Sequence, residues 1–151
     1  PDKKILAIDA DPAVGLSTAL GIDVKAENPK LCARQSVING VLVDGGHNVD
    51  AAKALQAKIS DEVAVIAMMK DKNVEAYLSL IAPKCKTIYA TEVNNERSMK
   101  AHELAAVAKK YCKNVLCFDN AFDAVEAAKG DGLSLVCGSF YLFRQIRKEL
   151  I

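Results

Sequence analysis

The sequence has no tryptophan, and only 5% of its 151 residues are aromatic. It also lacks an excess of either charge, since 20 Lys and Arg residues stand against 19 Asp and Glu residues. No apolar run approaches the roughly 20 residues that a membrane-spanning helix needs. A nearly neutral chain lacks the basic excess with which proteins bind a phosphate backbone. These absences argue against nucleic acid and membrane as partners and favour a single globular domain.

The cysteines lack the spacing of a metal or disulfide site. There is no CxxC pair, and an odd number of cysteines fits neither a disulfide framework nor a zinc site. Most of the five lie within apolar runs, and we predict that they are reduced and mostly buried: Cys32, Cys85, Cys112, Cys117 and Cys137. The first residues contain an apolar stretch of only five residues before an acidic segment, which is atypical of a signal peptide. We therefore expect a cytoplasmic protein.

The common nucleotide-binding loops are missing as well. Neither GxxxxGK[ST] nor GxGxxG occurs, so the chain has no phosphate-cradling or dinucleotide-binding loop of its own. No Ser/His/Asp constellation is supported by more than the presence of those residue types. His102 lies on a predicted helix beside charged neighbours, and we expect it at the surface. We expect no metal site and no autonomous ATP hydrolysis.

Short β-branched runs alternate with longer segments of helical period, which is typical of βαβ units and predicts a three-layer α/β fold with a mostly parallel sheet. Most predicted strands are apolar nearly throughout, as expected for strands covered on both faces. The predicted strands are Lys4–Asp9, Gln35–Ile38, Val41–Asp44, Glu62–Met68, Lys86–Ala90, Asn114–Phe118 and Leu133–Cys137. The predicted helices are Val49–Ile59, Asn73–Ile81, Ser98–Tyr111 with Ser98 as N-cap, Ala121–Lys129 and Phe140–Leu150. Weak periodicity, several charges and a proline over residues 21–31 indicate a connection, so we divide the chain into residues 1–31 and 32–151.

The strongest local motif is the turn Asp44–Asn48, which follows an apolar strand and precedes a helix. At the carboxyl end of a parallel strand, such a turn lies in the crevice where open α/β sheets bind ligands. Its two glycines allow close approach of a ligand, Asn48 is a good N-cap, and the helix N-terminus favours an anion. The alternative is a tight turn of structural value only, with His47 projecting into solvent.

Three further turns follow strands in the same way. Gly138 and Ser139 offer backbone N–H groups and a hydroxyl to a carboxylate or phosphate, although Ser139 also fits a plain helix cap. The charged turns Met69–Lys72 and Thr91–Arg97 would line the same edge, unless they are ordinary solvated loops.

Five motifs in this order resemble a known pattern over some 120 residues: Ala33-Arg34-Gln35, Asp44-Gly45-Gly46-His47-Asn48, Asp71-Lys72-Asn73, Asn95-Glu96-Arg97 and Val136-Cys137-Gly138-Ser139-Phe140. From about residue 32 to 151 the chain resembles the C-terminal domain of folylpolyglutamate synthase, a member of the Mur ligase superfamily. It departs from the family pattern in having Gly46 for alanine, Glu96 for proline, and Cys32-Ala33 for the Pro-Gly before Arg34.

The resemblance implies a six-stranded, mostly parallel Rossmann-like domain, with one antiparallel strand, that closes over an N-terminal ATPase domain. In that family ATP with magnesium phosphorylates a folate carboxylate, and the amine of glutamate attacks the acyl phosphate. The implied nucleotide contacts are Arg34, Asp44, His47 and Asn48, and the implied glutamate contacts are Asp71, Lys72, Asn95, Arg97 and Ser139. The chain would be one domain of an ADP-forming ligase of folate and one-carbon metabolism, without a catalytic residue of its own and inactive alone.

Residues 3–22 resemble a different family, the second-strand region of deviant Walker A ATPases, with Asp9 and Asp11 at the positions that help to hold magnesium and water. The phosphate loop that precedes this region in that family is missing, so we expect Asp9 and Asp11 to be structural remnants and Lys4–Asp9 to be an additional strand. Two resemblances meeting near residue 31 are consistent with a fragment, a natural fusion or an engineered chimera. The alternative functions are a non-catalytic α/β scaffold and a small nucleotide-binding module built on Asp44–Asn48.

Overall fold

The computed structural model describes residues 35–151. Several predictions therefore lie outside the described residues. They concern the strand Lys4–Asp9, the connection over residues 21–31, and the residues Asp9, Asp11, Cys32 and Arg34.

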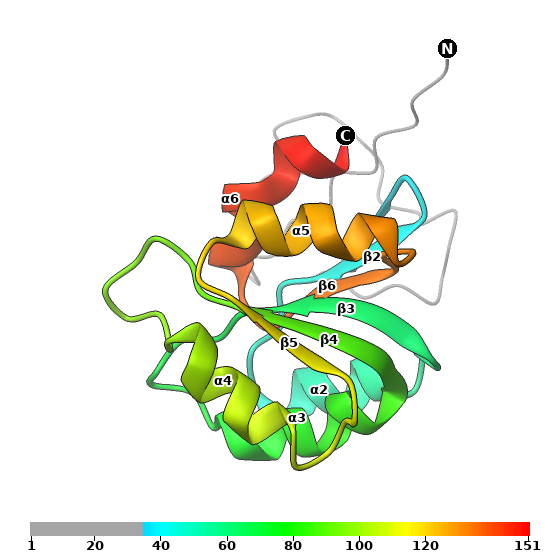
Figure 1. Cartoon of the computed structure of the whole chain (residues 1–151). Coiled ribbons are helices and arrows are strands. Elements are labelled where there is room, and N and C mark those ends of the chain that lie inside the picture. Colours follow the sequence, from blue (N-terminus) through cyan, green and yellow to red (C-terminus); the bar gives the residue numbers. More distant parts are fainter. Residues whose placement is uncertain (1–34) are drawn as a thin grey trace, which may run out of the picture.

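The described chain forms a six-stranded sheet in the order β1-β2-β6-β3-β4-β5 (Figure 1). The strands are β1 (Gln35–Ile38), β2 (Val41–Asp44), β3 (Glu62–Ile66), β4 (Cys85–Thr91), β5 (Val115–Phe118) and β6 (Leu135–Cys137). β1 pairs with β2 in antiparallel fashion, whereas the other neighbouring strands are parallel. The predicted mostly parallel sheet with one antiparallel strand is confirmed.

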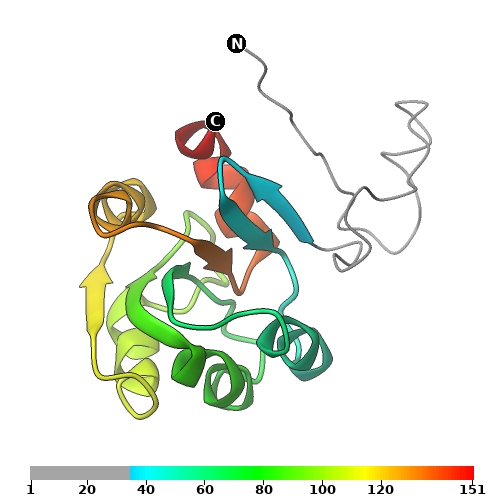
Figure 2. The same cartoon turned by 90° about the vertical axis from the view of Figure 1, so that its right-hand side faces the viewer.

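Helices cover both faces of this sheet. Figure 2 shows α2, α3 and α4 on one side and α5 and α6 on the other. Their bounds are α2 (Val49–Gln56), α3 (Val74–Ile81), α4 (Ala101–Ala108), α5 (Ala121–Gly130) and α6 (Phe140–Leu150), with a 3-10 turn at Ala82–Lys84. The fold is therefore the predicted three-layer, Rossmann-like α/β sandwich.

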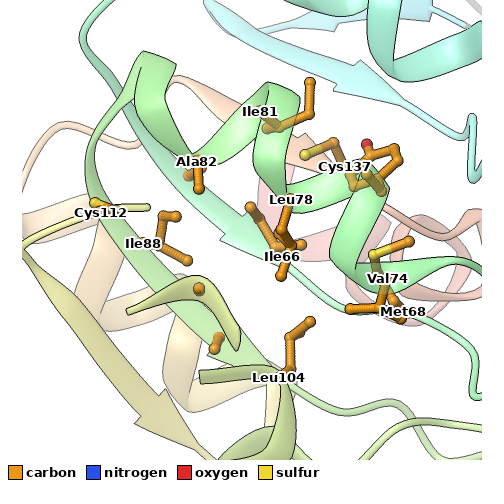
Figure 3. Packing of buried hydrophobic residues seen from close by; sticks show 14 of the residues in the cluster. Ile66, Met68, Val74, Leu78, Ile81, Ala82, Ile88, Leu104, Cys112 and Cys137 are labelled. Carbon is orange, nitrogen blue, oxygen red and sulfur yellow. The ribbon is translucent and has the colours of Figure 1, made fainter. Parts of the chain in front are cut away.

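Successive residues of one strand enter two different cores. In β3, Ala64 and Ile66 pack with α2, α3 and α4, whereas Val63 and Val65 pack with α5 and α6. Because side chains alternate across a strand, a strand covered on both faces must be apolar at every position. Figure 3 shows the first of these cores, where Ile66 and Leu78 meet in its centre.

The prediction that Ser98 caps a helix is wrong. Helix α4 begins at Ala101, and Lys100 occupies the cap position without a capping side-chain bond. Ser98 instead pairs with Met69 in an isolated antiparallel bridge, which holds the backbone extended. Its buried hydroxyl accepts from the Val93 amide at 3.0 Å and donates to the Met99 carbonyl at 3.2 Å. Ser98 therefore anchors the loop that leads into the helix.

The expectation of strands covered on both faces fails at β5. This strand forms one edge of the described sheet, and Leu116 is 45% exposed there. Cys117 is also exposed, whereas Cys112 and Cys137 are buried and Cys85 is half-buried. The prediction of buried thiols is therefore correct for Cys112 and Cys137, correct in part for Cys85, and wrong for Cys117, which lies on an edge strand with a neighbour on one side only.

Candidate functional site

The carboxyl ends of four strands lie in one row. The strand register aligns Asp44 of β2 with Cys137 of β6, Cys137 with Ile66 of β3, and Ile66 with Ala90 of β4. The four loops that follow these residues therefore leave the sheet along one edge. This row brings together motifs that lie almost a hundred residues apart in sequence.

The turn Asp44–Asn48 is held from within. Asp44 is 2% exposed. Its Oδ1 accepts a hydrogen bond from the backbone amide of Gly46 at 2.7 Å, and its Oδ2 accepts one from the side-chain Nε2 of Gln35 at 2.6 Å. A Cβ at position 46 would collide with Ala51 and with Asp44 Oδ1. Glycine in place of the family's alanine thus matches this tight backbone.

Helix α2 starts directly after this turn. Asn48 is its N-cap, as predicted, and its Oδ1 accepts from the Ala51 amide at 2.8 Å. The side chain of His47 is exposed beside this helix start. The turn thus presents a helix N-terminus and an imidazole to solvent, while the Asp44 carboxylate lies beneath them.

The two loops beyond β3 and β4 are tied together by backbone hydrogen bonds. The Lys70 amide donates to the Arg97 carbonyl at 2.7 Å, and the Met99 amide donates to the Met68 carbonyl at 2.8 Å. Gly138, which follows β6, has a φ of +98°, and a Cβ there would collide with the Ala67 carbonyl oxygen. These contacts hold the strand ends close together at the edge of the sheet.

The predicted glutamate contacts occupy neighbouring parts of this edge. Asp71 and Lys72 form an ion pair with 3.6 Å between Oδ2 and Nζ. The Oδ1 of Asn95 accepts from the Arg97 amide at 2.9 Å. Ser139 is 4% exposed and caps α6 by accepting from the Tyr141 amide at 3.1 Å. Asn95 and Ser139 therefore both have local structural bonds, whereas the charged groups of Lys72 and Arg97 lie nearer to solvent.

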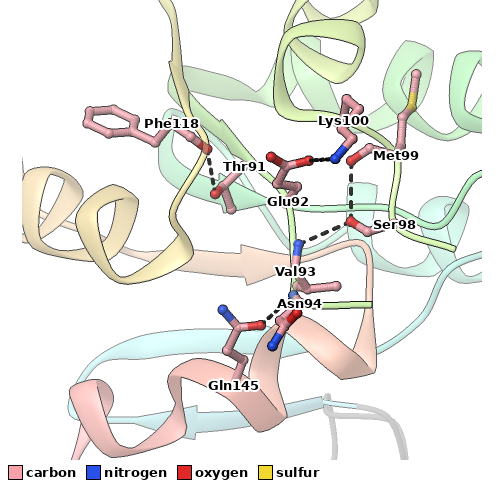
Figure 4. Close-up of polar contacts among 9 residues, drawn as sticks. All are labelled: Thr91, Glu92, Val93, Asn94, Ser98, Met99, Lys100, Phe118 and Gln145. Atoms are coloured by element: carbon pink, nitrogen blue, oxygen red, sulfur yellow. Dashed lines mark hydrogen bonds and ion pairs between the residues drawn. The ribbon is translucent and has the colours of Figure 1, made fainter. Parts of the chain in front are cut away.

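Figure 4 shows the loop after β4, which borders a cavity of about 670 Å³. The Gln145 Oε1 accepts from the Asn94 amide at 2.9 Å, and Lys100 lies 3.5 Å from Glu92. Thr91 donates to the Phe118 carbonyl at 2.7 Å and ties the ends of β4 and β5 together.

Of the predicted site residues that the structure describes, only Asn95 lines this cavity. Lys70, from the predicted turn Met69–Lys72, also lines it, whereas sequence reasoning missed Lys100, Asn120 and Gln145. Asn120 follows a predicted parallel strand, so the rule applied to the other loops could have found it. The described side chains thus do not place all predicted site residues in one crevice.

Three titratable groups, Tyr77, Cys85 and Cys137, lie in or against the core between the sheet and helices α2, α3 and α4. Burial raises the pKa of the Cys137 thiol well above its usual value, and burial raises the pKa of Cys85 to about 12. Tyr77 is 1% exposed, and its hydroxyl has no hydrogen-bond partner among the described residues. Burial, together with nearby Cys137 and Asp44, raises its pKa. These thiols stay protonated near neutral pH and are poor nucleophiles.

Within residues 35–151, no group of three His, Cys, Asp or Glu side chains is placed to hold a metal ion. No helix in the same range is long and apolar enough to cross a membrane.

Comparisons with known proteins agree on one group of relatives. The dihydrofolate synthase/folylpolyglutamate synthase of Haemophilus influenzae is 25% identical over 149 residues, covering 89% of this chain and 32% of that protein. Residues 32–151 make up less than 89% of this chain, so the alignment extends into the segment before residue 32. The resemblance of residues 3–22 to deviant Walker A ATPases stays a prediction.

Solved structures give the same result. E. coli FolC in complex with DHPP and ADP matches with a TM-score of 0.64 and 25% identity, covering 77% of this chain and 30% of that one. The bifunctional folylpolyglutamate synthase/dihydrofolate synthase of Yersinia pestis matches in fold with a TM-score of 0.66 at 24% identity, covering 84% and 32%. The chain therefore spans about a third of the length of these relatives.

The family model described as "Mur ligase, glutamate ligase domain" matches residues 32–140. This match covers more than half of the chain and includes all the loops at the edge of the sheet. The chain belongs to the Mur ligase family, as its glutamate ligase domain.

Proposed function

We propose that this chain is the ATP- and glutamate-contacting domain of a ligase of the folylpolyglutamate synthase type. The observation that carries the proposal is the row Asp44, Cys137, Ile66 and Ala90, which brings four motif-bearing loops to one edge of the sheet. The relatives named above support it, since the names of the Haemophilus influenzae and Yersinia pestis proteins include folylpolyglutamate synthase and the E. coli protein is in complex with ADP. No comparable observation supports the alternative that the chain is a non-catalytic scaffold.

The turn Asp44–Asn48 is the proposed nucleotide contact. The N-terminus of α2 carries partial positive charge and open N–H groups, which suit phosphate oxygens. His47 is exposed next to it and can donate to the nucleotide. Both oxygens of Asp44 already accept hydrogen bonds, so we assign Asp44 to shaping the turn. Arg34 stays a prediction, because it lies outside the described residues.

Lys72, Arg97 and Ser139 are the proposed contacts of glutamate. Two cations and a helix N-terminus suit a substrate that carries two carboxylates. In a ligase of this type the glutamate amine attacks the acyl carbon of the folate acyl phosphate. The new C–N bond forms while the C–O bond to phosphate breaks, and inorganic phosphate leaves. Asp71 and Asn95 orient their partners Lys72 and Arg97 through the ion pair and the loop bond described above.

Magnesium does not fit the described residues as a resident ion, because they offer no set of three ligands. Cradling of the ATP phosphates and binding of folate are assigned to a partner ATPase domain, since the sequence has no GxxxxGK[ST] loop. We also propose that the family domain begins near residue 32.

Chemical-shift titration of the ¹⁵N-labelled chain tests this proposal. ATP should shift the amides of Gly45–Asn48 first, whereas glutamate should shift those around Arg97 and Gly138–Phe140. His47→Ala should weaken the ATP response, and His102→Ala, which changes the other exposed histidine, should not. No shift at the edge of the sheet with millimolar ligand would favour the scaffold. Shifts clustered around Asp9 and Asp11 would place the nucleotide site in the N-terminal segment instead.

A further inference from the structure

A chain of three hydrogen bonds runs from the surface to the turn after β2. Lys58 Nζ donates to Gln35 Oε1 at 2.6 Å, Gln35 Nε2 donates to Asp44 Oδ2 at 2.6 Å, and the Gly46 amide donates to Asp44 Oδ1 at 2.7 Å. Gln35 is fully buried, and Asp44 is nearly so. Gln35 and Asp44, the two buried residues of this series, thus form a polar network beneath the predicted nucleotide contact.

The charges at the two ends determine the direction of the Gln35 amide. An amide has one accepting end and one donating end. In the observed orientation the oxygen faces the Lys58 ammonium and the NH₂ group faces the Asp44 carboxylate. The flipped orientation would place NH₂ against an ammonium and oxygen against a carboxylate, so both contacts would be repulsive. Lys58 and Asp44 therefore select a single orientation of Gln35.

Gln35 also connects two strands at the level of the turn. It is the first residue of β1, and the antiparallel register pairs it with Asp44, the last residue of β2. Its side chain holds one carboxylate oxygen, so the other oxygen points to the Gly46 amide. Without the Gln35 donor, the carboxylate would be buried with one oxygen less well satisfied, which is costly. Rotation of that carboxylate would release Gly46.

We propose that Gln35 is the positioning residue of the turn Asp44–Asn48 and that Lys58 sets the direction of its amide. Gln35 acts through Asp44 and touches no ligand itself. Its value for nucleotide binding rests on the function proposed above. The positioning of the turn can be measured without any ligand.

Hydrogen exchange of individual amides in the whole chain tests the proposal. Gln35→Met keeps a similar length and removes both hydrogen-bonding groups. We expect the protection of the Gly46 amide to fall by about 10- to 100-fold more than that of the core amides of Val65 and Ile66. A purely structural role would lower all three protections by the same factor, and this result would overturn the proposal.

Two controls make the result specific. Gln145→Met removes a glutamine that accepts from a loop amide on another part of the edge, and it should leave Gly46 protected. Lys58→Met should lower Gly46 protection by about two- to fivefold, because Lys58 is exposed. Lys53→Met, an exposed lysine on α2, should not. Should Gln35→Met fail to fold, the comparison of Lys58→Met with Lys53→Met decides. Equal protection of the Gly46 amide in these two variants would refute the proposal.

ATP titration of the same variants separates this inference from the proposed function. If ATP shifts the turn in the wild-type chain, Gln35→Met should weaken that binding severalfold, and Gln56→Met, at the last residue of α2, should not. If ATP shifts nothing at the turn, the proposed nucleotide role fails, while the exchange result still decides whether Gln35 positions the turn.

Discussion

The guanidinium of Arg97 lies 5.8 Å over the ring centroid of Tyr141 and donates a 3.2 Å hydrogen bond to its hydroxyl. This contact joins the loop after β4 to the first turn of α6. Both residues are exposed, so the contact adds little to stability. It holds a cation beside the helix start that Ser139 caps.

Arg97→Ala should weaken the response to glutamate and leave the fold intact. Removing a cation that faces a carboxylate should raise the Kd for glutamate by about tenfold, with less than about 1 kcal/mol lost in unfolding free energy. Chemical-shift titration and urea unfolding measure the two quantities. Arg147→Ala on the exposed face of α6 is the matched control. An equal loss of glutamate binding in both variants would show that only net charge matters.

Val65→Asp should abolish cooperative unfolding or lower the free energy of unfolding by about 3 kcal/mol or more, because it buries an unpaired carboxylate. Val65 is fully buried in β3, which pairs with β4 and β6. Val37→Asp makes the same change on β1 at a residue that is 38% exposed, and it should cost far less. Urea denaturation followed by circular dichroism compares them. Similar midpoints for the two variants would contradict the burial of β3 between two helix layers.

Tyr77→Phe should leave the chain as stable as before or about 1 kcal/mol more stable, because the hydroxyl that it removes is buried and has no hydrogen-bond partner within residues 35–151. Tyr89→Phe provides the opposite case. The Tyr89 hydroxyl donates to Asp131, and burial together with this bond raises the pKa of Tyr89 to about 12. Removal of the Tyr89 hydroxyl should lower the free energy of unfolding by about 1 kcal/mol. Thermal unfolding of both variants measures the difference, and a larger loss for Tyr77→Phe would reveal a partner for that hydroxyl.

Cys117 should react with a thiol reagent before the other described cysteines. It is exposed on the edge strand, whereas Cys112 and Cys137 are buried and burial raises the pKa of Cys85 to about 12. Partial burial and the nearby Asp119 also raise the pKa of Cys117, so its labelling should accelerate with rising pH above the usual thiol value. Peptide mapping by mass spectrometry identifies the labelled site. Early modification of Cys137 would contradict its burial under α3.

The chain alone should not hydrolyse ATP or add glutamate to a folate, because its sequence has no loop to cradle the β- and γ-phosphates. An assay of ADP release with magnesium, read against a blank without protein, measures this directly. ADP release that disappears in an Asp44→Ala variant would assign hydrolysis to this chain.

The sequence by itself determined the class of fold and the identity of most elements. A continuous apolar run such as Val63–Met69 can be satisfied only by burial on both faces, and helical periodicity marks the segments that provide this cover. Local chemistry also determined the caps Asn48 and Ser139, since a capping side chain needs only its own next residues. These features depend on neighbours in sequence and are therefore readable from it.

Only the tertiary structure decided which distant residues meet. β6, the last strand in sequence, inserts between β2 and β3 and so places Cys137 beside Asp44. Ser98 leaves the helix because Met69, 29 positions earlier, pairs with it. Gln35 looks like an ordinary polar residue at a strand start, yet it is fully buried because Asp44 and Lys58 satisfy both ends of its amide. Such partners depend on strand order and register, which arise from packing of the whole sheet rather than from any local pattern.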